Sequence, residues 1–469
     1  MSRTRAASRL DRCRGAVLAL AFLSLAACTR VAPDAGFPDV QKAVSERLGK
    51  TVSWNRGTER DKAVGDRIAA LLANPLTPDA AVEIALINNP ELQAAFEEIG
   101  LAQADLVQAG LLANPGLELS ALAATPQTAY SATVVEDFLN VFTRAARTRL
   151  AGEALERTSF LIASRVIDHA AEVRTAYYAV VADQQTAALL RQVTDATKAA
   201  AELSERQRRA GNISSRDQAL QQSLYANALL QQAQAENQLA TDRETLNRRL
   251  GLWQADAAWT VPDRLPDLPQ DAPTEAVLER QAIANRLDLA AAKKDVELAA
   301  DNLGFLRDYR FLQEFGLGFE FERDSDNAHK RGPVLRLSLP VFDRQQGQAR
   351  ALESELRRKE RLLEALAIEL RTKVRAAYAR ASTARMSAQF YQQNLMPLNE
   401  QIVRESQRYY NGMLLGVYDL LLARQNQINA AREYVNALKE YWTARTELER
   451  LVGGRLPSAS DPEPHGEQP

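Results

Sequence analysis

The stretch from Arg344 to Leu451 constrains the fold most, because its pattern predicts two very long helices folded back on each other at Asn411-Gly412. Apolar residues in its first half recur at steps of three and four, which places them on one face of a helix. Little between Arg344 and Met396 would break that helix, since the segment has one glycine and no proline. The second half has the seven-residue spacing of a coiled-coil seam, at Leu421, Ile428, Val435 and Trp442. At 1.5 Å per residue, arms of roughly 55 to 65 residues would be about 80 to 100 Å long, longer than a compact domain.

The chain repeats this plan, because matching segments recur at nearly constant spacing. Pro90-Glu91-Leu92 resembles Leu287-Asp288-Leu289 at an offset of 197 residues. Two further pairs match at an offset of 201 residues: Ala210-Gly211-Asn212 with Asn411-Gly412-Met413, and Arg249-Leu250-Gly251 with Arg450-Leu451-Val452. These matches indicate a tandem duplication of a unit of about 200 residues. We expect each unit to run helix, strand pair and long helical hairpin, with the seam of the first hairpin at Val166, Val173 and Val180.

These patterns divide the 469 residues into six segments. In chain order we expect a signal peptide at 1–27, an N-terminal arm at 28–76, a first repeat at 77–260, a proline-rich linker at 261–273, a second repeat at 274–452 and a disordered tail at 453–469. The strand pairs are expected at about 115–140 and 313–342, and the helical hairpins at about 144–250 and 344–451. Thr77 is the expected N-cap of the first repeat, with Pro78 at the first helical position.

The first residues form a targeting segment. Five arginines precede an apolar run, Ala16 to Ala27, that is too short to span a bilayer stably. The run closes on Leu25-Ala26-Ala27-Cys28, which looks like a bacterial lipobox, in which the cysteine is lipidated and becomes the mature N-terminus. An ordinary signal peptide followed by a chance cysteine is the alternative. Since Cys13 is lost with the signal, one cysteine remains in the mature chain and no intramolecular disulfide can form.

Two segments of the second repeat alternate between apolar and polar residues, as strands with two different faces do. The alternating apolar residues are Phe315, Leu317, Phe319 and Phe321, then Leu335, Leu337, Leu339 and Val341. We expect a charged loop, Asp324 to Gly332, between them, and a weaker strand pair in the first repeat. A half-buried hairpin over a soluble core is the commoner use of this pattern. A chain with a lipobox and no other core to cover favours strands that face lipid on one side instead. Because two strand pairs cannot close a barrel, copies of the chain would have to assemble.

Composition and motifs argue against nucleic-acid binding and catalysis. The net charge is -2, which gives the chain no excess of basic residues for a nucleic acid. The three histidines, His169, His329 and His465, are scattered, and HExxH, CxxC, GxSxG and P-loop patterns are absent. His169 is expected to pack in a helical seam beside Val166 and Val173. We therefore expect no enzyme, no cofactor and no bound metal.

Four motifs occur in order along nearly the whole mature chain. They are Asn88-Asn89-Pro90-Glu91-Leu92, Gln108-Ala109-Gly110-Leu111-Leu112-Ala113-Asn114-Pro115, Ala210-Gly211-Asn212-Ile213-Ser214 and Leu339-Pro340-Val341-Phe342-Asp343. Together they resemble the outer-membrane efflux channel family, the TolC-like outer membrane factors, although the family often has Leu-Pro-Asn-Pro where this chain has Ala113-Asn114-Pro115. The resemblance implies a mostly α fold with a small β part. It also implies a homotrimer in which each copy lends four strands to one transmembrane β-barrel and its duplicated helical hairpins to one α-helical tunnel across the periplasm.

The resemblance implies the outer-membrane channel of a tripartite efflux system, which exports small molecules or metal ions with a periplasmic adaptor (membrane fusion) protein and an inner-membrane pump. The stretch from Tyr410 to Asp419 resembles tips of members associated with resistance-nodulation-division pumps, some of them for heavy metals. Thr29 after Cys28 resembles lipoproteins sorted to the outer membrane, so we expect a lipid-anchored protein that extends into the periplasm. A non-conducting coiled-coil envelope lipoprotein and the exit duct of a type I protein secretion system remain as alternatives.

The hairpin tips are the candidate functional site. Gly211 and Gly412 are expected to reverse the two hairpins, and the resemblance implies that these tips meet the adaptor. The expected adaptor contacts are Gly211, Ile213, Gly412, Met413, Leu414 and Leu415. Asp217 and Asp419 lie just past the tips, and the resemblance implies carboxylates that close the periplasmic entrance there. The alternative is that each aspartate sits in the first turn of its helix, where a carboxylate favours the positive end of the dipole.

Overall fold

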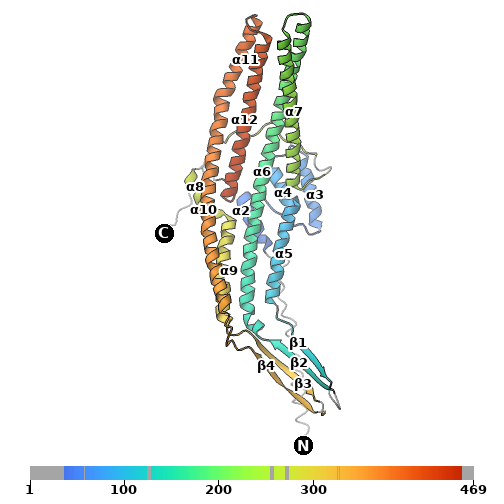
Figure 1. Ribbon diagram of the computed structural model, residues 1–469, viewed down its shortest axis with the longest axis vertical. Coiled ribbons are helices and arrows are strands. Elements are labelled where there is room, and N and C mark those ends of the chain that lie inside the picture. Colours follow the sequence, from blue (N-terminus) through green and yellow to red (C-terminus); the bar gives the residue numbers. More distant parts are fainter. Residues whose placement is uncertain are drawn as a thin grey trace. The chain divides into compact units, whose positions relative to one another are not determined.

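The computed structural model describes residues 36–57, 59–123, 128–253, 258–269, 274–324, 326 and 328–456. The expected signal peptide, 1–27, the expected lipidation site Cys28 and residues 457–469 lie outside this range. The first repeat contains α4 (Pro78–Asn88), α5 (Pro90–Gly110), β1 (Gly116–Leu122), β2 (Ala129–Asp137), α6 (Leu139–Arg209) and α7 (Ser215–Leu250) (Figure 1). The second contains α8 (Glu275–Asn285), α9 (Leu287–Tyr309), β3 (Phe315–Arg323), β4 (His329–Leu337), α10 (Gln346–Phe390), the single π-helical turn η2 (Tyr391–Leu395), α11 (Met396–Asn411) and α12 (Val417–Leu451). The same order of helices and strands in both halves confirms the predicted duplication.

In the described residues before the first repeat, the structure has the helices α2 (Phe37–Leu48) and α3 (Glu59–Leu72). Val40 and Val44 of α2 are fully buried. Arg67 of α3 donates a hydrogen bond to Glu83 of α4 at 2.7 Å. The described part of the N-terminal arm is therefore largely helical.

The chain divides into two compact units, each built from both repeats. The sheet unit comprises residues 36–38, Glu97–Ser159 and Ala291–Leu363, and the helical unit comprises the remaining described residues. Helices α5, α6, α9 and α10 each contribute residues to both units.

The sheet unit contains one four-stranded antiparallel sheet in the order β1-β2-β3-β4. The central pair, β2 with β3, joins the two repeats, with Val134 opposite Phe319. Gly318 is required at this pairing, because a Cβ there would lie 2.4 Å from the carbonyl oxygen of Val134. Within the chain, β1 and β4 are left as the two edges of the sheet.

The predicted two-faced pattern of the sheet is confirmed. Leu117, Val134 and Phe319 are cross-strand neighbours on one face, and all three are exposed. The opposite face carries Glu118, Thr133 and Glu320, which the same register brings together. An exposed apolar face on a sheet with two unpaired edges must be shielded from water, and lipid can provide that shielding.

The second strand pair differs from its predicted limits. β4 begins at His329, inside the segment that was expected to be a loop, and it ends at Leu337. Leu339 and Val341 therefore lie beyond the strand, where Pro340 has no N–H with which to continue a ladder. Pro333 is tolerated within β4 because β4 is an edge strand.

Ion pairs tie the helices of the sheet unit together. Asp295 of α9 accepts hydrogen bonds from Arg157 of α6 at 2.8 Å and from Lys359 of α10 at 3.2 Å. Lys294, also on α9, lies 3.1 Å from Glu156 of α6. One turn of α9 thus links the first repeat to the second.

Most of the predicted seam positions lie in the core of the helical unit, whereas Leu421 and Trp442 of α12 are only half-buried. Val166, Val173 and Val180 of α6 are fully buried, and Ile428 and Val435 of α12 are nearly so. His169 is 5% exposed, as expected for a packed residue, and a ring nitrogen lies 3.0 Å from the carbonyl oxygen of Arg249. Burial lowers the pKa of this imidazole, so His169 is neutral in the core.

The base of the first hairpin is held by one buried amide. Asn89, 1% exposed, donates through Nδ2 to the carbonyl oxygens of Arg248 and Arg249, at the end of α7. Its Oδ1 accepts from the backbone N–H groups of Glu91 and Leu92, at the start of α5. A single side chain therefore caps two helix ends that would otherwise leave buried polar groups unpaired.

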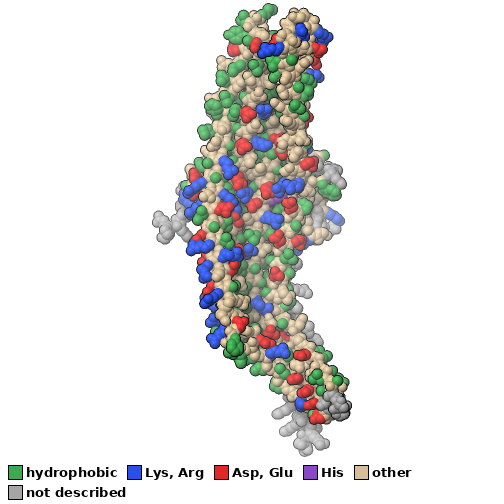
Figure 2. All heavy atoms as spheres, viewed as in Figure 1, with side chains coloured by type: hydrophobic (Ala, Val, Ile, Leu, Met, Phe, Trp, Pro, Cys, Tyr) green, Lys and Arg blue, Asp and Glu red, His purple; other side chains and the backbone are tan. Residues whose placement is uncertain are grey.

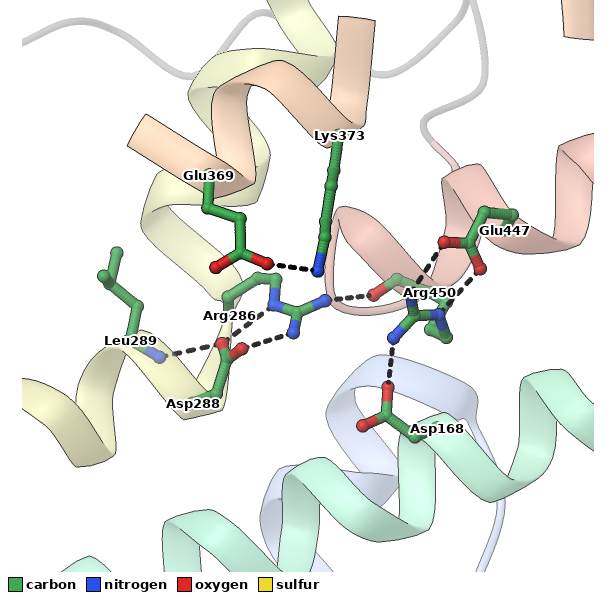
Figure 3. Close-up of polar contacts among 8 residues, drawn as sticks. All are labelled: Asp168, Arg286, Asp288, Leu289, Glu369, Lys373, Glu447 and Arg450. Carbon is green, nitrogen blue, oxygen red and sulfur yellow. Dashed lines mark hydrogen bonds and ion pairs between the residues drawn. The ribbon is translucent and has the colours of Figure 1, made fainter. Parts of the chain in front are cut away.

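The base of the second hairpin uses charges for the same task (Figure 3). Arg286 donates to the carbonyl oxygen of Arg450 at the end of α12, and it pairs with Asp288. Asp288 accepts from the N–H of Leu289 at 2.8 Å, as Asn89 does for α5. Arg450 in turn binds Asp168 of α6 at 3.0 Å. The neutral amide of one repeat is thus replaced by an arginine and an aspartate in the other.

The first arm of the second hairpin is helical throughout, as predicted, but one π-turn interrupts its regular α-helical hydrogen-bond pattern. α10 ends at Phe390, and the π-turn Tyr391–Leu395 separates it from α11. Pro397 lies in the first turn of α11, where a missing N–H costs little. The first hairpin has no such break, since α6 runs without interruption from Leu139 to Arg209.

Candidate functional site

The first hairpin reverses at Gly211, as predicted. Gly211 has φ +78°, a left-handed conformation that glycine adopts without strain. Its N–H donates to the carbonyl oxygen of Arg208 at 3.0 Å, and the next N–H, from Asn212, donates to that of Gln207 at 2.8 Å. These two bonds close the end of α6.

The second hairpin reverses one residue later than predicted. Gly412 has φ -83°, and the left-handed residue is Met413, with φ +58°. The N–H group of Met413 donates to the backbone carbonyl oxygen of Tyr410, and that of Leu414 donates to the carbonyl oxygen of Tyr409. The first tip has the same pattern of hydrogen bonds. Gly412 and Gly211 are therefore not equivalent, and the offset between the two tips is 202 residues.

This offset places Asp217 and Asp419 at equivalent positions. Each lies three residues after the residue that caps its helix, Ser214 for α7 and Gly416 for α12. Asp217 accepts from the Ser214 hydroxyl at 2.8 Å, and Asp419 accepts from the N–H of Gly416 at 3.3 Å. Both carboxylates thus contribute to helix caps.

A hydrogen bond joins the two hairpins near their tips. The Tyr418 hydroxyl, at the start of α12, donates to the side-chain oxygen of Gln207, near the end of α6, at 2.7 Å. Burial, and then the negative charge of Asp217, raises the pKa of Tyr418, so the phenol stays protonated and remains a donor. Sequence reasoning missed this pair, because no local pattern links residues so far apart in the chain.

A groove lies beside this hydrogen bond. It has a volume of about 250 Å³ and is lined by α6, α7 and α12. Its walls include Val193, Ala200, Leu220, Leu224, Leu421 and Leu422, with Tyr418 and Asp419 at one end. The two hairpins are therefore not packed tightly against each other at this level.

The second tip carries the exposed apolar patch that the sequence predicted. Met413 is 93% exposed and Leu414 is 75% exposed, whereas Leu415 and Ile213 are half-buried. Figure 2 shows hydrophobic side chains gathered at this end of the second hairpin. Two large apolar side chains held in water at a loop indicate a partner surface.

A partly buried carboxyl group links both hairpins in the middle of the helical unit. Asp183 of α6 lies 3.0 Å from the ammonium group of Lys439 on α12. Burial, together with the nearby carboxyl group of Asp242 on α7, raises the pKa of Asp183 to about 6. This group therefore titrates near neutral pH.

Within the part of the chain that the structure describes, no three or more His, Cys, Asp or Glu residues are grouped so as to hold a metal ion. Over the same residues, no helix combines the length and apolar character needed to cross a membrane.

Comparisons with known proteins agree with this architecture. The family model for outer membrane efflux proteins matches residues 81–252 and 278–454, one match in each repeat. The cobalt-zinc-cadmium resistance protein CzcC of Cupriavidus metallidurans is 25% identical over 392 residues, which cover 81% of this chain and 91% of that protein.

Solved channels share the fold. The CmeC outer membrane channel of Campylobacter jejuni superposes with a TM-score of 0.69 at 15% identity, over 88% of this chain and 92% of that one. The outer membrane protein VceC of Vibrio cholerae gives a TM-score of 0.64 at 17% identity, over 80% and 96%. Because the family model covers most of both repeats, the chain belongs to the outer membrane efflux protein family, the channel components of tripartite efflux systems.

Proposed function

We propose that this channel exports divalent metal cations from the periplasm across the outer membrane. The support is the similarity to CzcC, which spans 91% of that cobalt-zinc-cadmium resistance protein and 81% of this chain. Metal cations need no enzyme to pass a duct, only a water-filled path whose charge does not repel them. An inner-membrane pump supplies the energy, and a periplasmic adaptor joins the pump to the channel.

The working channel is a homotrimer. The sheet has one apolar face and two edges, β1 and β4, that lack a partner strand within the chain. A sheet in lipid cannot leave edge N–H and C=O groups unpaired, so it must close with copies of itself. Three copies would supply the strands of one barrel, and lipidation of Cys28 would add an anchor in the outer membrane.

The hairpin tips form the periplasmic entrance and its gate. Copies that converge there bring Asp419 near its symmetry mates, and a ring of carboxylates attracts cations. Asp217 has a larger share in capping, because it exchanges two hydrogen bonds with Ser214. The bond between Tyr418 and Gln207 supports a closed state, since it ties α12 to α6 beside the groove.

The adaptor would bind the tips at Gly211, Ile213, Gly412, Met413, Leu414 and Leu415. The exposure of Met413 and Leu414 supports this contact. The double substitution Leu414→Asp with Leu415→Asp should abolish cross-linking to the adaptor while the trimer still forms. Undiminished cross-linking in that variant would exclude the second tip as the contact.

The proposed cargo is tested by deleting the gene in the native host. The deletion strain should lose tolerance to Zn²⁺, Co²⁺ and Cd²⁺ and accumulate these ions, and the wild-type chain should restore both. The control is a panel of organic drugs, whose inhibitory concentrations should change little. Unchanged metal tolerance with increased drug sensitivity would refute the metal proposal and favour a drug channel. Loss of a secreted protein would favour type I secretion.

A further inference from the structure

The second hairpin contains one residue more than the first, and the extra residue can be located. Buried residues of α10 match those of α6 at an offset of 201 residues. The matched pairs are His169 with Leu370, Val173 with Val374, Val180 with Ala381 and Ala187 with Ala388. Beyond the tips the offset is 202, because the left-handed residues Gly211 and Met413 correspond, as do the left-handed Gly251 and Gly453 after α7 and α12. The insertion therefore lies between Ala388 and Met413.

The π-turn Tyr391–Leu395 accommodates this insertion. A π-turn adds one residue to a helix, because its hydrogen bonds run over five residues where an α-helix spans four. The N–H of Met396 donates to the carbonyl oxygen of Tyr391 in this way. Pro397 follows immediately and cannot donate to the residue four positions before it, so the regular ladder cannot re-form across the turn.

The segment beyond the π-turn is weakly held within the chain. α11 contains no buried residue, and neither does the π-turn. The corresponding part of α6 buries Val193, Thr194 and Ala200. A pocket of about 140 Å³, lined in part by Met396, lies between α11 and its neighbours α6 and α12. Few buried contacts and open space beside a break in the helix are the features of a segment that moves.

We infer that the π-turn Tyr391–Leu395 with Pro397 is a hinge about which α11 and the second tip bend, while the first hairpin stays fixed. This inference rests on the proposed function, because it names the element that lets the entrance open. Bending at the hinge carries Met413 and Leu414 with α11 and moves the start of α12. The bond between Tyr418 and Gln207 then breaks. A contact of the adaptor with the exposed tip would thus act directly on the moving segment.

Amide hydrogen exchange on the purified protein tests the hinge. In the wild type, amides of α11 should exchange at least about tenfold faster than those at the end of α6, because opening at the hinge needs no global unfolding. A straightened variant lacks Gln393, an exposed residue of the π-turn, and carries Pro397→Ala. It restores the residue count of the first hairpin, and its α11 should exchange about tenfold or more slowly than that of the wild type.

Two matched variants control this experiment. Gln393→Ala keeps both the extra residue and the proline, so it should exchange like the wild type. Pro397→Ala alone keeps the chain length and should show an intermediate rate, which preserves the test if the straightened variant does not assemble. Equal exchange of α11 in the wild type, the straightened variant and Pro397→Ala would overturn the hinge.

Single-channel recording separates the hinge from the proposed function. The straightened variant should open about tenfold less often than the wild type, with unchanged current through each open channel. A wild-type protein that conducts nothing would contradict the channel, whereas exchange would still report on the hinge. Wild-type opening frequency in the straightened variant would overturn the hinge and leave the channel intact.

Discussion

Removing the hydrogen bond between the hairpins should open the channel. Tyr418→Phe deletes the hydroxyl that donates to Gln207 at 2.7 Å and keeps the ring that packs beside the groove. A hydrogen bond of this kind contributes about 1 kcal/mol net. In the proposed trimer three such bonds break together, about 3 kcal/mol, which shifts the ratio of closed to open channels roughly 100-fold.

The assay is the open probability of purified trimers in planar bilayers. Gln207→Leu removes the acceptor and should have the same effect, and the double variant should open no more than either single one, because both remove one interaction. Tyr409→Phe, at an exposed tyrosine of α11, is the control and should behave as the wild type. Additive effects of Tyr418→Phe and Gln207→Leu, or equal opening in Tyr409→Phe, would refute the reasoning.

Three further predictions concern stability and anchoring. Asn89→Ala removes four hydrogen bonds from the buried base of the first hairpin, so it should lower the free energy of local opening there by about 3 kcal/mol. The measurement is the exchange rate of the backbone amide of Leu92, which should rise. An unchanged rate would show that the Asn89 side chain is dispensable. The pKa of Asp183 is about 6 in the folded protein and has its ordinary value of 3.8 in the unfolded chain. The stability that Asp183 contributes is therefore complete below pH 4 and is lost as the pH rises through 6. The loss in the free energy of unfolding is up to about 3 kcal/mol. Asp183→Asn should flatten the melting temperature over this range, and a profile like that of the wild type would contradict the assignment. Cys28→Ser should abolish incorporation of labelled palmitate while the assembled trimer stays in the outer membrane, and retained label would exclude the lipobox.

The regular parts of the fold could be predicted because they depend on local periodicity. Val166, Val173 and Val180 mark the seam of α6 by spacing alone, and all three are fully buried. The strands of the second repeat were recognised in the same way, although β4 extends into a charged segment that shows no alternation. The spacing of apolar residues identifies which face of a helix or strand is buried more reliably than it identifies where that helix or strand begins and ends.

The irregular parts were missed because they depend on register between distant segments. Because glycine favours positive φ, the sequence predicts Gly412 as the turn residue. The extra residue of the π-turn instead moves the left-handed position to Met413. No residue type marks the insertion in the sequence. It is found only by comparing the buried positions of α6 and α10. Tyr418 and Gln207 meet because the hairpins lie together near their tips, which no short window of sequence contains.

The most direct test of the account is the conductance of the wild-type protein itself. Purified chain that migrates as a trimer should insert into planar bilayers and give discrete current steps with a preference for cations. That preference should weaken as salt screens the carboxylates at the entrance. A stable trimer that binds the membrane but never conducts, even with Tyr418→Phe, would contradict the channel and leave a structural envelope lipoprotein in its place.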